Sequence, residues 1–202
     1  MPRNLWVAKI VRNDVSDDGL VRCGWANVRP GPDFDLYRNY HDQEWGRPLH
    51  GRLALFERMS LEAFQSGLSW LIILRKRENF RRAFSGFDIE KVAGYADADV
   101  QRLMADEGIV RNRAKIESTI ANARVAAEMG SEDLSELLWS FAPAPRPRPA
   151  GPSEIPSTSE ESKAMARELK RRGFRFVGPT TAYALMQATG MVDDHIRDCW
   201  VP

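Results

Sequence analysis

The sequence has few or none of the residues and patterns on which several classes of protein depend. It contains only two cysteines, Cys23 and Cys199, so it has no disulfide framework, and this cysteine usage is typical of a cytoplasmic protein. It has no run of about 18 apolar residues, so we expect no membrane-spanning helix. The N-terminal residues lack the apolar stretch and cleavage site of a secretory signal. We therefore predict a cytoplasmic protein with no membrane partner.

An excess of charge is also missing. The 29 basic and 28 acidic residues give a formal net charge of +1, so an argument for nucleic acid binding must rest on local basic patches. The length of 202 residues suits one domain with a sizeable core. Residues 1–20 show no sustained hydrophobic period, and we expect a disordered N-terminal extension there, before a single domain at residues 21–202.

No convincing strand pattern occurs, whereas helical patterns are frequent. Apolar residues recur at intervals of three and four between Leu53 and Leu68, and the apolar run that continues to Leu74 predicts a buried segment. Further helices are predicted at residues 112–127, 162–172 and 180–189. Residues 142–159 hold six prolines and predict an extended connection over the surface. The expected fold class is all-α.

Both cysteines and two of the three histidines fall near opposite ends of the chain. Cys23 is followed by His41, and His195 and Cys199 are four residues apart, which would place them on one face of a helix. Two thiolates and two imidazoles are the donor set of a closed tetrahedral zinc site. Only the second pair has the close spacing of a zinc finger. Buried thiols and histidines in polar networks are the alternative interpretation.

A basic helix is followed by the turn sequence GFRFVG at residues 173–178 and then by an apolar helix. Gly173 and Gly178 would permit a tight turn with positive φ. The helix that begins near Thr180 would direct backbone N–H groups and its positive dipole end toward a phosphate. Basic side chains surround this position, namely Lys170, Arg171, Arg172 and Arg175. A packing corner with solvated arginines would have the same local pattern.

Eight longer segments occur in order: CGW (23–25), YHDQEWG (40–46), LEAFQSGLSW (61–70), LRKREN (74–79), GIVRNRAKI (108–116), SEIPS (153–157), KRRGFRFVGPTTAYALMQATG (170–190) and VDDH (192–195). Together they closely resemble the 3-methyladenine DNA glycosylase I family, of the helix-hairpin-helix DNA glycosylase superfamily. The resemblance runs from about residue 21 to the C-terminus. It implies a helix-hairpin-helix fold and excision of N3-methyladenine from alkylated double-stranded DNA. It also implies one structural zinc ion that joins the terminal segments through Cys23, His41, His195 and Cys199.

The resemblance also implies roles for residues of a base-binding pocket. Glu62 would be the catalytic residue and would bind the edge of a cationic base, and the alternative is a solvated helix residue. Tyr40 and Trp70 would flank the base, because aromatic faces attract positive charge. Trp25 and Trp45 are further candidate walls, and core packing is the alternative for each aromatic residue. A base in a duplex must be extruded to reach such a pocket.

The expected DNA contacts lie in the turn and in a second basic segment. They are Gly173, Gly178, Thr180 and Arg175 in the first, and Arg111, Arg113 and Lys115 in the second. Bifunctional relatives carry a nucleophilic lysine in the hairpin, and Thr180 occupies the matching position here. The resemblance therefore implies a monofunctional enzyme without lyase activity that releases free 3-methyladenine. We expect a monomer, because the substrate is one lesion at a time.

Two positions and the substrate range are left open. Asp193 lies in a Val-Asp-x-His frame in which other members of the superfamily place an essential aspartate. The resembled family itself often has asparagine there. Asp193 could therefore begin a helix or stabilise an oxocarbenium ion. Phe64 stands where this family can have a polar residue, which leaves the polarity of the pocket floor undetermined. The alternative functions are a non-catalytic helix-hairpin-helix DNA-binding protein and a glycosylase of broader alkylpurine scope that includes 7-methylguanine.

Overall fold

The structure, a computed structural model, describes residues 18–26, 31–129 and 133–202. Throughout these ranges the regular elements are helices, and no strand occurs among them, which confirms the all-α class. In the same ranges no helix has both the length and the apolar character that a membrane span requires. The expected extension at residues 1–20 lies almost entirely outside the described residues.

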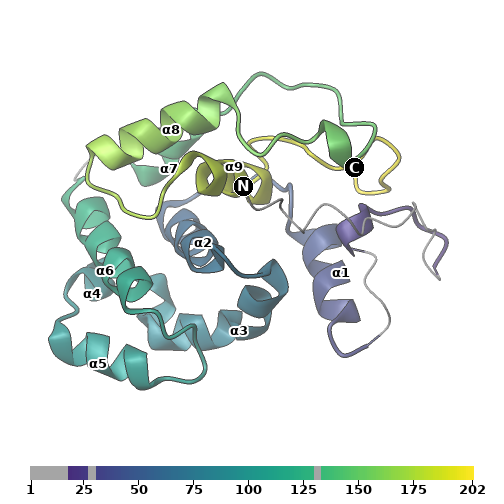
Figure 1. Ribbon diagram of the computed structural model, residues 1–202. Helices are drawn as coiled ribbons and strands as arrows, with labels where there is room; N and C mark the ends of the chain where they lie inside the picture. The colour runs from purple at the N-terminus through teal and green to yellow at the C-terminus, as the bar shows by residue number, and fades with distance from the viewer. Residues whose placement is uncertain (1–17, 27–30, 130–132) are drawn as a thin grey trace, which may run out of the picture.

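The helices follow one another through short connections, apart from the long connection at residues 140–159 (Figure 1). They are α1 (Phe34–Gln43), α2 (Arg52–Gln65), α3 (Trp70–Ala83), α4 (Ile89–Ala93), α5 (Asp97–Ala105), α6 (Arg113–Glu128), α7 (Leu134–Trp139), α8 (Glu160–Arg171) and α9 (Pro179–Ala188), with short 3-10 turns η1 (Gly24–Ala26), η2 (Ser85–Phe87) and η3 (Pro152–Glu154). The helices predicted at residues 112–127, 162–172 and 180–189 are present, with ends shifted by one or two residues.

The long apolar stretch around Leu68 is divided between two helices. Gly67 has a φ of 81°, which ends α2 and starts the turn that leads to α3. Leu68, in this turn, is 36% exposed. The prediction that the whole run from Leu68 to Leu74 is buried is therefore wrong at Leu68, because the turn directs that side chain toward solvent, and Leu71 and Ile72 are only partly buried.

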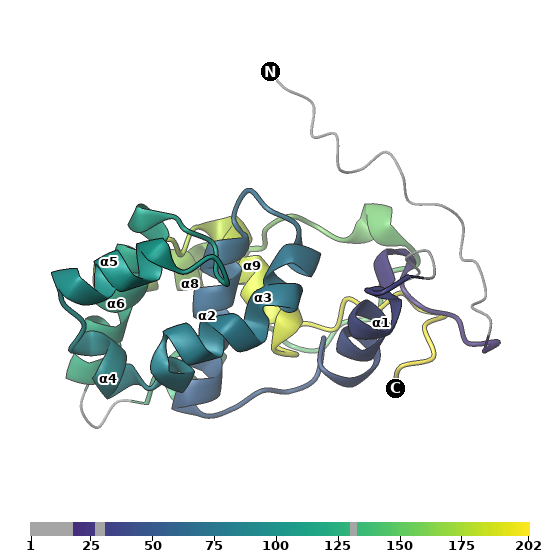
Figure 2. The ribbon, with the colours of Figure 1, turned by 90° about the horizontal axis from the view of Figure 1, so that it is seen from below.

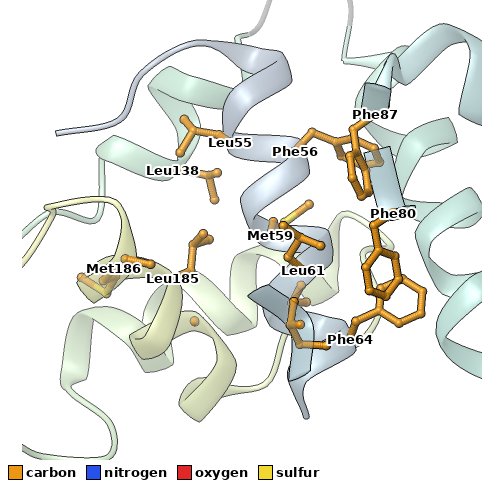
Figure 3. Close-up of a cluster of buried hydrophobic side chains, with 14 of the residues drawn as sticks. Leu55, Phe56, Met59, Leu61, Phe64, Phe80, Phe87, Leu138, Leu185 and Met186 are labelled. Atoms are coloured by element: carbon orange, nitrogen blue, oxygen red, sulfur yellow. The ribbon is translucent and has the colours of Figure 1, made fainter. Parts of the chain in front are cut away.

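Helix α2 occupies the centre of the helical layer and packs against α3, α6, α7 and α9 (Figures 1 and 2). Figure 3 shows its apolar side chains in two groups, one near α7 and α9 and the other near α3 and η2. The first group includes Leu55 with Leu138, Leu185 and Met186, and the second includes Phe56 and Phe64 with Phe80 and Phe87. A helix that is covered on several sides can carry polar residues into the interior, and α2 does so with Arg58 and Glu62.

The segment around α1 and the C-terminal segment lie side by side (Figures 1 and 2). The backbone N–H of Trp200 donates to the backbone oxygen of Val21 at 2.9 Å. Gly190 has a φ of 71°, and a Cβ there would lie 2.6 Å from the carbonyl carbon of Arg47. Only glycine fits this crossing, so Gly190 allows the C-terminal segment to approach the segment between α1 and α2.

The proline-rich connection at residues 142–159 contains η3 and is otherwise without regular structure, as predicted. Arg146 pairs with Asp194 at 2.7 Å, and Arg148 pairs with Asp193 at 2.7 Å. The backbone N–H of Arg197 donates to the Pro149 oxygen at 2.8 Å. These contacts fasten the connection to the C-terminal segment, which leaves it beside α9.

Candidate functional site

Four side chains from the two ends of the chain form one buried cluster, Cys23, His41, His195 and Cys199, with donor atoms within 4.8 Å of one another. Cys199 Sγ lies 3.4 Å from His195 Nδ1 and 3.6 Å from His41 Nε2. Cys23 Sγ lies 3.6 Å from His195 Nδ1. A tetrahedron with the bond lengths typical of zinc has sulfur–nitrogen edges of about 3.5 Å. The geometry of the cluster therefore fits a four-coordinate metal ion.

Each histidine of the cluster has its second ring nitrogen beside a protein acceptor. His41 Nδ1 lies 2.7 Å from Asp42 Oδ1, and His195 Nε2 lies 3.1 Å from the Trp45 backbone oxygen. When these nitrogens carry the ring protons, His41 Nε2 and His195 Nδ1 present lone pairs to the two sulfurs. This arrangement is usual for histidines that bind a metal.

The Cys23 and Cys199 thiols affect each other's pKa in opposite directions, so one of them ionises more readily than the other. The hydrogen bond with Cys23, with further bonds to His195 and His41, lowers the pKa of Cys199 to about 2. The same bond and burial raise the pKa of Cys23. A divalent cation would remove the repulsion between two buried thiolates. The donor chemistry therefore fits a metal ion as the geometry does.

The segment that carries His195 and Cys199 is not helical, although their spacing predicted a shared helical face. The backbone N–H of Cys199 donates to the Ile196 oxygen at 2.8 Å and closes a turn. The side chain of Asp193 accepts from the His195 backbone N–H at 3.2 Å. The side chains of His195 and Cys199 thus reach the same cluster through a turn, because the chain is no longer helical after Gly190.

A cavity of about 320 Å³ lies beside the cluster. This volume is at the small end of the range for ligand pockets. Aromatic rings from α1, α3 and the neighbouring segments form much of its wall, and α9 and the proline-rich connection provide the rest. The lining residues are Trp25, Tyr37, Tyr40, Trp45, Glu62, Gln65, Trp70, Pro152, Ile155, Ala184 and Gln187.

The aromatic residues of the cavity form one continuous wall. The ring centroids of Tyr40 and Trp70 are 5.1 Å apart with planes tilted by 42°. Tyr40 lies 6.2 Å from Trp25, whose ring lies 5.1 Å from that of Trp45. Two rings in contact leave no slot between them, so Tyr40 and Trp70 do not face each other across a base in this structure. They instead offer adjacent surfaces on the same side of the cavity.

The cluster and the aromatic wall are built from the same short segments. Trp25 follows Cys23 by two residues, and Tyr40 directly precedes His41. The ring of Trp25 lies 5.1 Å from that of His41. An ion that held the cluster together would therefore also fix the position of the wall.

Glu62 provides the carboxyl group among the lining residues and is only 5% exposed, which excludes the solvated alternative. Burial raises its pKa to about 7, and the Arg58 guanidinium one helical turn earlier opposes part of this rise. Trp70 Nε1 is also buried, without a hydrogen-bond partner in the protein. The cavity thus combines an acid, an unused donor and aromatic surface, a combination suited to a flat cationic ligand.

Sequence reasoning missed several residues of the cavity. Tyr37 lies three residues before Tyr40, and Gln65 lies three residues after Glu62, so helical spacing could have revealed both. Gln187 and its neighbours from α9 and the connection have no local signal. Gln187 Nε2 donates to Asp194 Oδ2 at 2.8 Å, which fixes its place in the wall.

Phe64, which the sequence placed as a candidate for the floor of the pocket, lies outside the cavity. Its side chain is fully buried, and its ring lies 4.6 Å from that of Phe80 and 5.8 Å from that of Phe84. The polar character of this side of the cavity comes from Glu62 and Gln65 instead.

The turn between α8 and α9 differs from the prediction in one glycine. Gly173 has a φ of 98°, and Phe176 has the second positive φ of the turn, 55°. Gly178 has a φ of −67° and precedes α9 as its N-cap residue, so the prediction of a positive φ there is wrong. No side chain caps this helix, which begins at Pro179 and places Thr180 in its first turn.

A groove of about 540 Å³ lies between α8 and this turn. Its basic lining residues are Lys163, Arg167, Lys170 and Arg175, and apolar residues such as Phe174 and Val177 also line it. No carboxylate is among the lining residues. The groove therefore has the charge of an anion-binding surface.

The second basic segment contains one residue that cannot bind a phosphate. Lys115 is 6% exposed, and its Nζ donates to the backbone oxygens of Phe64 at 2.8 Å and Ser66 at 2.5 Å. The expected phosphate contact is thus wrong for Lys115, because its ammonium group is engaged in the interior. Arg111 and Arg113 are exposed and pair with the carboxylates of neighbouring turns.

Comparison with known proteins agrees with this arrangement. A family model described as methyladenine glycosylase matches residues 31–202. DNA-3-methyladenine glycosylase 1 of Escherichia coli (strain K12) is 45% identical over 184 residues, which cover 89% of this chain and 96% of the relative. A crystal structure of 3-methyladenine DNA glycosylase I has a TM-score of 0.83 with 43% identity, over 89% of this chain and 98% of that chain. A variant of such an enzyme in complex with 3-methyladenine has a TM-score of 0.82 with 33% identity, over 90% of this chain and 97% of that chain. The chain belongs to the methyladenine glycosylase family.

Proposed function

We propose that the protein is a DNA repair glycosylase that hydrolyses the N-glycosidic bond of N3-methyladenine in alkylated DNA and releases free 3-methyladenine. The observation that carries the proposal is a buried acid, Glu62, in an aromatic-walled cavity of about 320 Å³. N3-methyladenine in DNA is cationic, so it is complemented by a carboxylate and by aromatic faces. The similar protein of Escherichia coli carries this activity in its name, and a related variant binds 3-methyladenine in its crystal structure.

The reaction requires the damaged nucleotide to leave the duplex, because the glycosidic bond of a stacked base is out of reach of a recessed cavity. Glu62 binds the edge of the extruded base, and Tyr40, Trp70 and Trp25 cover one of its faces. Water then attacks the sugar carbon and loses a proton to solvent, the electron pair of the glycosidic bond passes to the base, and the base departs neutral. The cationic base is already a good leaving group, so orientation of the base contributes more than proton donation.

The helix-hairpin-helix made by α8, the turn and α9 holds the DNA backbone. Gly178 and Thr180 direct backbone N–H groups at the start of α9 toward a phosphate, Gly173 forms the turn that precedes them, and Arg175 adds a positive charge. The basic groove supports this role because no carboxylate lines it. Since the net charge of the chain is only +1, binding to undamaged DNA should be weak and sensitive to salt.

The enzyme is monofunctional in this proposal. No lysine is among the residues that line the cavity, and the Lys115 amine is held by two backbone oxygens. A Schiff base with the sugar therefore has no nucleophile. Asp193 pairs with Arg148 and supports the turn before His195, which favours a structural role. Asp193→Asn should excise the base at a near-normal rate.

The metal ion is structural zinc in this proposal, one per chain. Cys23, His41, His195 and Cys199 supply four ligands and leave no position for an activated water. The ion joins the N-terminal and C-terminal segments of one domain, residues 21–202. The protein acts as a monomer, because one lesion occupies one cavity.

A base-release assay tests the proposed function. The protein is incubated with methylated duplex DNA, and the released bases are separated by chromatography. We expect 3-methyladenine from the wild-type protein and at least tenfold less from Glu62→Gln, which keeps the shape of the side chain without its charge. DNA binding without release would favour the non-catalytic alternative, and release of 7-methylguanine at a similar rate would favour the broader scope. Borohydride should trap no covalent adduct with DNA.

A further inference from the structure

Arg58 is a buried cation that lies behind the aromatic wall of the cavity. It precedes Glu62 by one turn of α2, is 8% exposed, and is not one of the lining residues. Its guanidinium carbon lies 5.3 Å from the ring centroid of Tyr40 and 5.5 Å from that of Trp70. A guanidinium at this distance from two ring faces is attracted to both.

The same guanidinium joins three helices. Its Nη1 donates to Tyr40 Oη at 3.0 Å, and its Nη2 donates to Glu44 Oε2 at 3.4 Å. Glu44 also accepts a hydrogen bond from Arg77 Nη2 at 2.9 Å. Tyr40 belongs to α1 and Glu44 is its C-cap residue, whereas Arg77 and Trp70 belong to α3. From α2, Arg58 therefore contacts both of the helices that carry the wall.

Arg58 is also the basic residue nearest to Glu62 along the chain, and its charge acts on the pKa of Glu62. Tyr40 and Tyr37 of α1 line the same cavity, and Glu44 at the C-cap of α1 forms an ion pair with Arg77 of α3 beyond Arg58. Helix α9 contributes uncharged lining residues, Ala184 and Gln187. Of these groups, only Arg58 acts on the pKa of Glu62, and it favours the ionised carboxylate against burial. A buried carboxylate with one such partner costs less to keep charged.

We propose that Arg58 is a positioning residue, which holds the aromatic wall in place and supplies the positive charge that faces Glu62 from behind. This inference rests on the proposed function. Arg58 does not touch the base, since its side chain is not among those that line the cavity. Its effect reaches the substrate through the charge state of Glu62 and through the hydrogen bond to Tyr40.

The test is the pH profile of kcat/KM for release of 3-methyladenine, which reports ionisations of the free enzyme. In the wild-type protein kcat/KM should rise with pH and have its midpoint near 7, the pKa of Glu62. In Arg58→Met and Arg58→Gln the midpoint should move upward by roughly one pH unit, because the opposite charge is lost. Both variants should therefore lose roughly thirtyfold at pH 6.5 relative to their own value at pH 9, against roughly fourfold in the wild-type protein. Arg58→Lys keeps the charge and should restore the wild-type midpoint.

Arg77→Met is the matched control, because it also removes a guanidinium from Glu44 but leaves Arg58 beside Glu62. It should lower the melting temperature without moving the midpoint. If Arg58→Met does not fold, Arg58→Gln, which keeps an amide donor for Tyr40, decides the matter alone. An unchanged midpoint in the folded variants would overturn the role of Arg58 even if their activity fell. Absence of base release by the wild-type protein would instead overturn the proposed function.

Discussion

Lys115 Nζ donates a hydrogen bond of 2.8 Å to the backbone oxygen of Phe64, a residue 51 positions earlier in the chain. A second bond reaches the oxygen of Ser66, so the ammonium group binds two carbonyls at the C-terminal end of α2. Such carbonyls lack partners within the helix, and a positive charge there also matches the helix dipole. Lys115 therefore supports the turn that joins the helix of Glu62 to the helix of Trp70.

Replacement of Lys115 by methionine should destabilise the protein without changing its electrostatic attraction to DNA. The loss of both hydrogen bonds leaves buried carbonyls unsatisfied, which costs about 1–3 kcal/mol of unfolding free energy. Urea denaturation measures this change, and titration of duplex DNA at several salt concentrations measures the attraction. Arg113→Ala, at an exposed position, is the control and should change stability by less than about 0.5 kcal/mol. A reduced salt dependence in Lys115→Met would mean that the ammonium group binds a phosphate after all.

Glu62→Gln should be more stable than the wild-type protein in alkaline solution. Burial raises the pKa of Glu62 from 4.5 to about 7 in the folded protein. Its contribution to stability is therefore complete below pH 4.5 and is lost as the pH rises through about 7, since the folded state disfavours the charge. The amide has no charge to bury, so the variant should gain up to about 3 kcal/mol at pH 8.5. Denaturant unfolding at pH 5.5 and pH 8.5 checks this, and an equal difference at both values would contradict it.

Loss of the metal ion should disturb the aromatic wall as well as lower stability. Cys199→Ser removes one of four ligands, so the purified variant should contain less than one zinc per chain and melt at a lower temperature. Elemental analysis gives the metal content. The near-ultraviolet circular dichroism should change too, because Trp25 and Trp45 lie against the cluster histidines. Asp42→Asn keeps all ligands and should weaken zinc binding by about 10–100-fold in a chelator competition. A wild-type protein that keeps its stability after complete removal of metal would refute a structural ion.

The basic groove should account for part of the salt dependence of DNA binding. Each phosphate contact contributes about 0.9 to the slope of log K against log salt, so Arg167→Ala with Lys170→Ala should reduce the slope by about two. Affinity for free 3-methyladenine should stay the same, since the groove is separate from the cavity. Arg171→Ala is the control, because Arg171 is engaged with Glu168 at 2.6 Å. Equal slopes in the double variant and the wild-type protein would place the DNA elsewhere.

The helices could be predicted from the sequence because their apolar residues repeat with helical spacing, and α6, α8 and α9 end within one or two residues of the predicted positions. The four residues of the buried cluster and Glu62 of the cavity could be singled out in advance for a different reason. Cysteine and histidine are so rare in this chain that their chemistry stood out, and the family resemblance supplied the roles.

Other features depend on packing between distant segments, and no local pattern contains them. Lys115 lies in a basic sequence that is typical of an exposed segment, yet its ammonium group is buried because it donates a hydrogen bond to a backbone oxygen at the end of α2. The contact between Tyr40 and Trp70, and the buried position of Arg58 behind them, depend on how α1 and α3 meet α2. Gly178 shows the opposite case, because a glycine that would permit a positive φ does not adopt one.

The cluster at the two ends of the chain also sets the order in which the protein can mature on the ribosome. Residues 52–188, from α2 to α9, contain none of the four cluster residues, so the earlier part of this helical layer can fold before the chain is complete. Cys23 and His41, with Trp25 and Tyr40 beside them, can join the cluster only after His195 and Cys199 have been made. A nascent chain thus has Glu62 and Trp70 in their helices before Trp25 and Tyr40 are fixed, and the pocket is completed only when synthesis has passed residue 199.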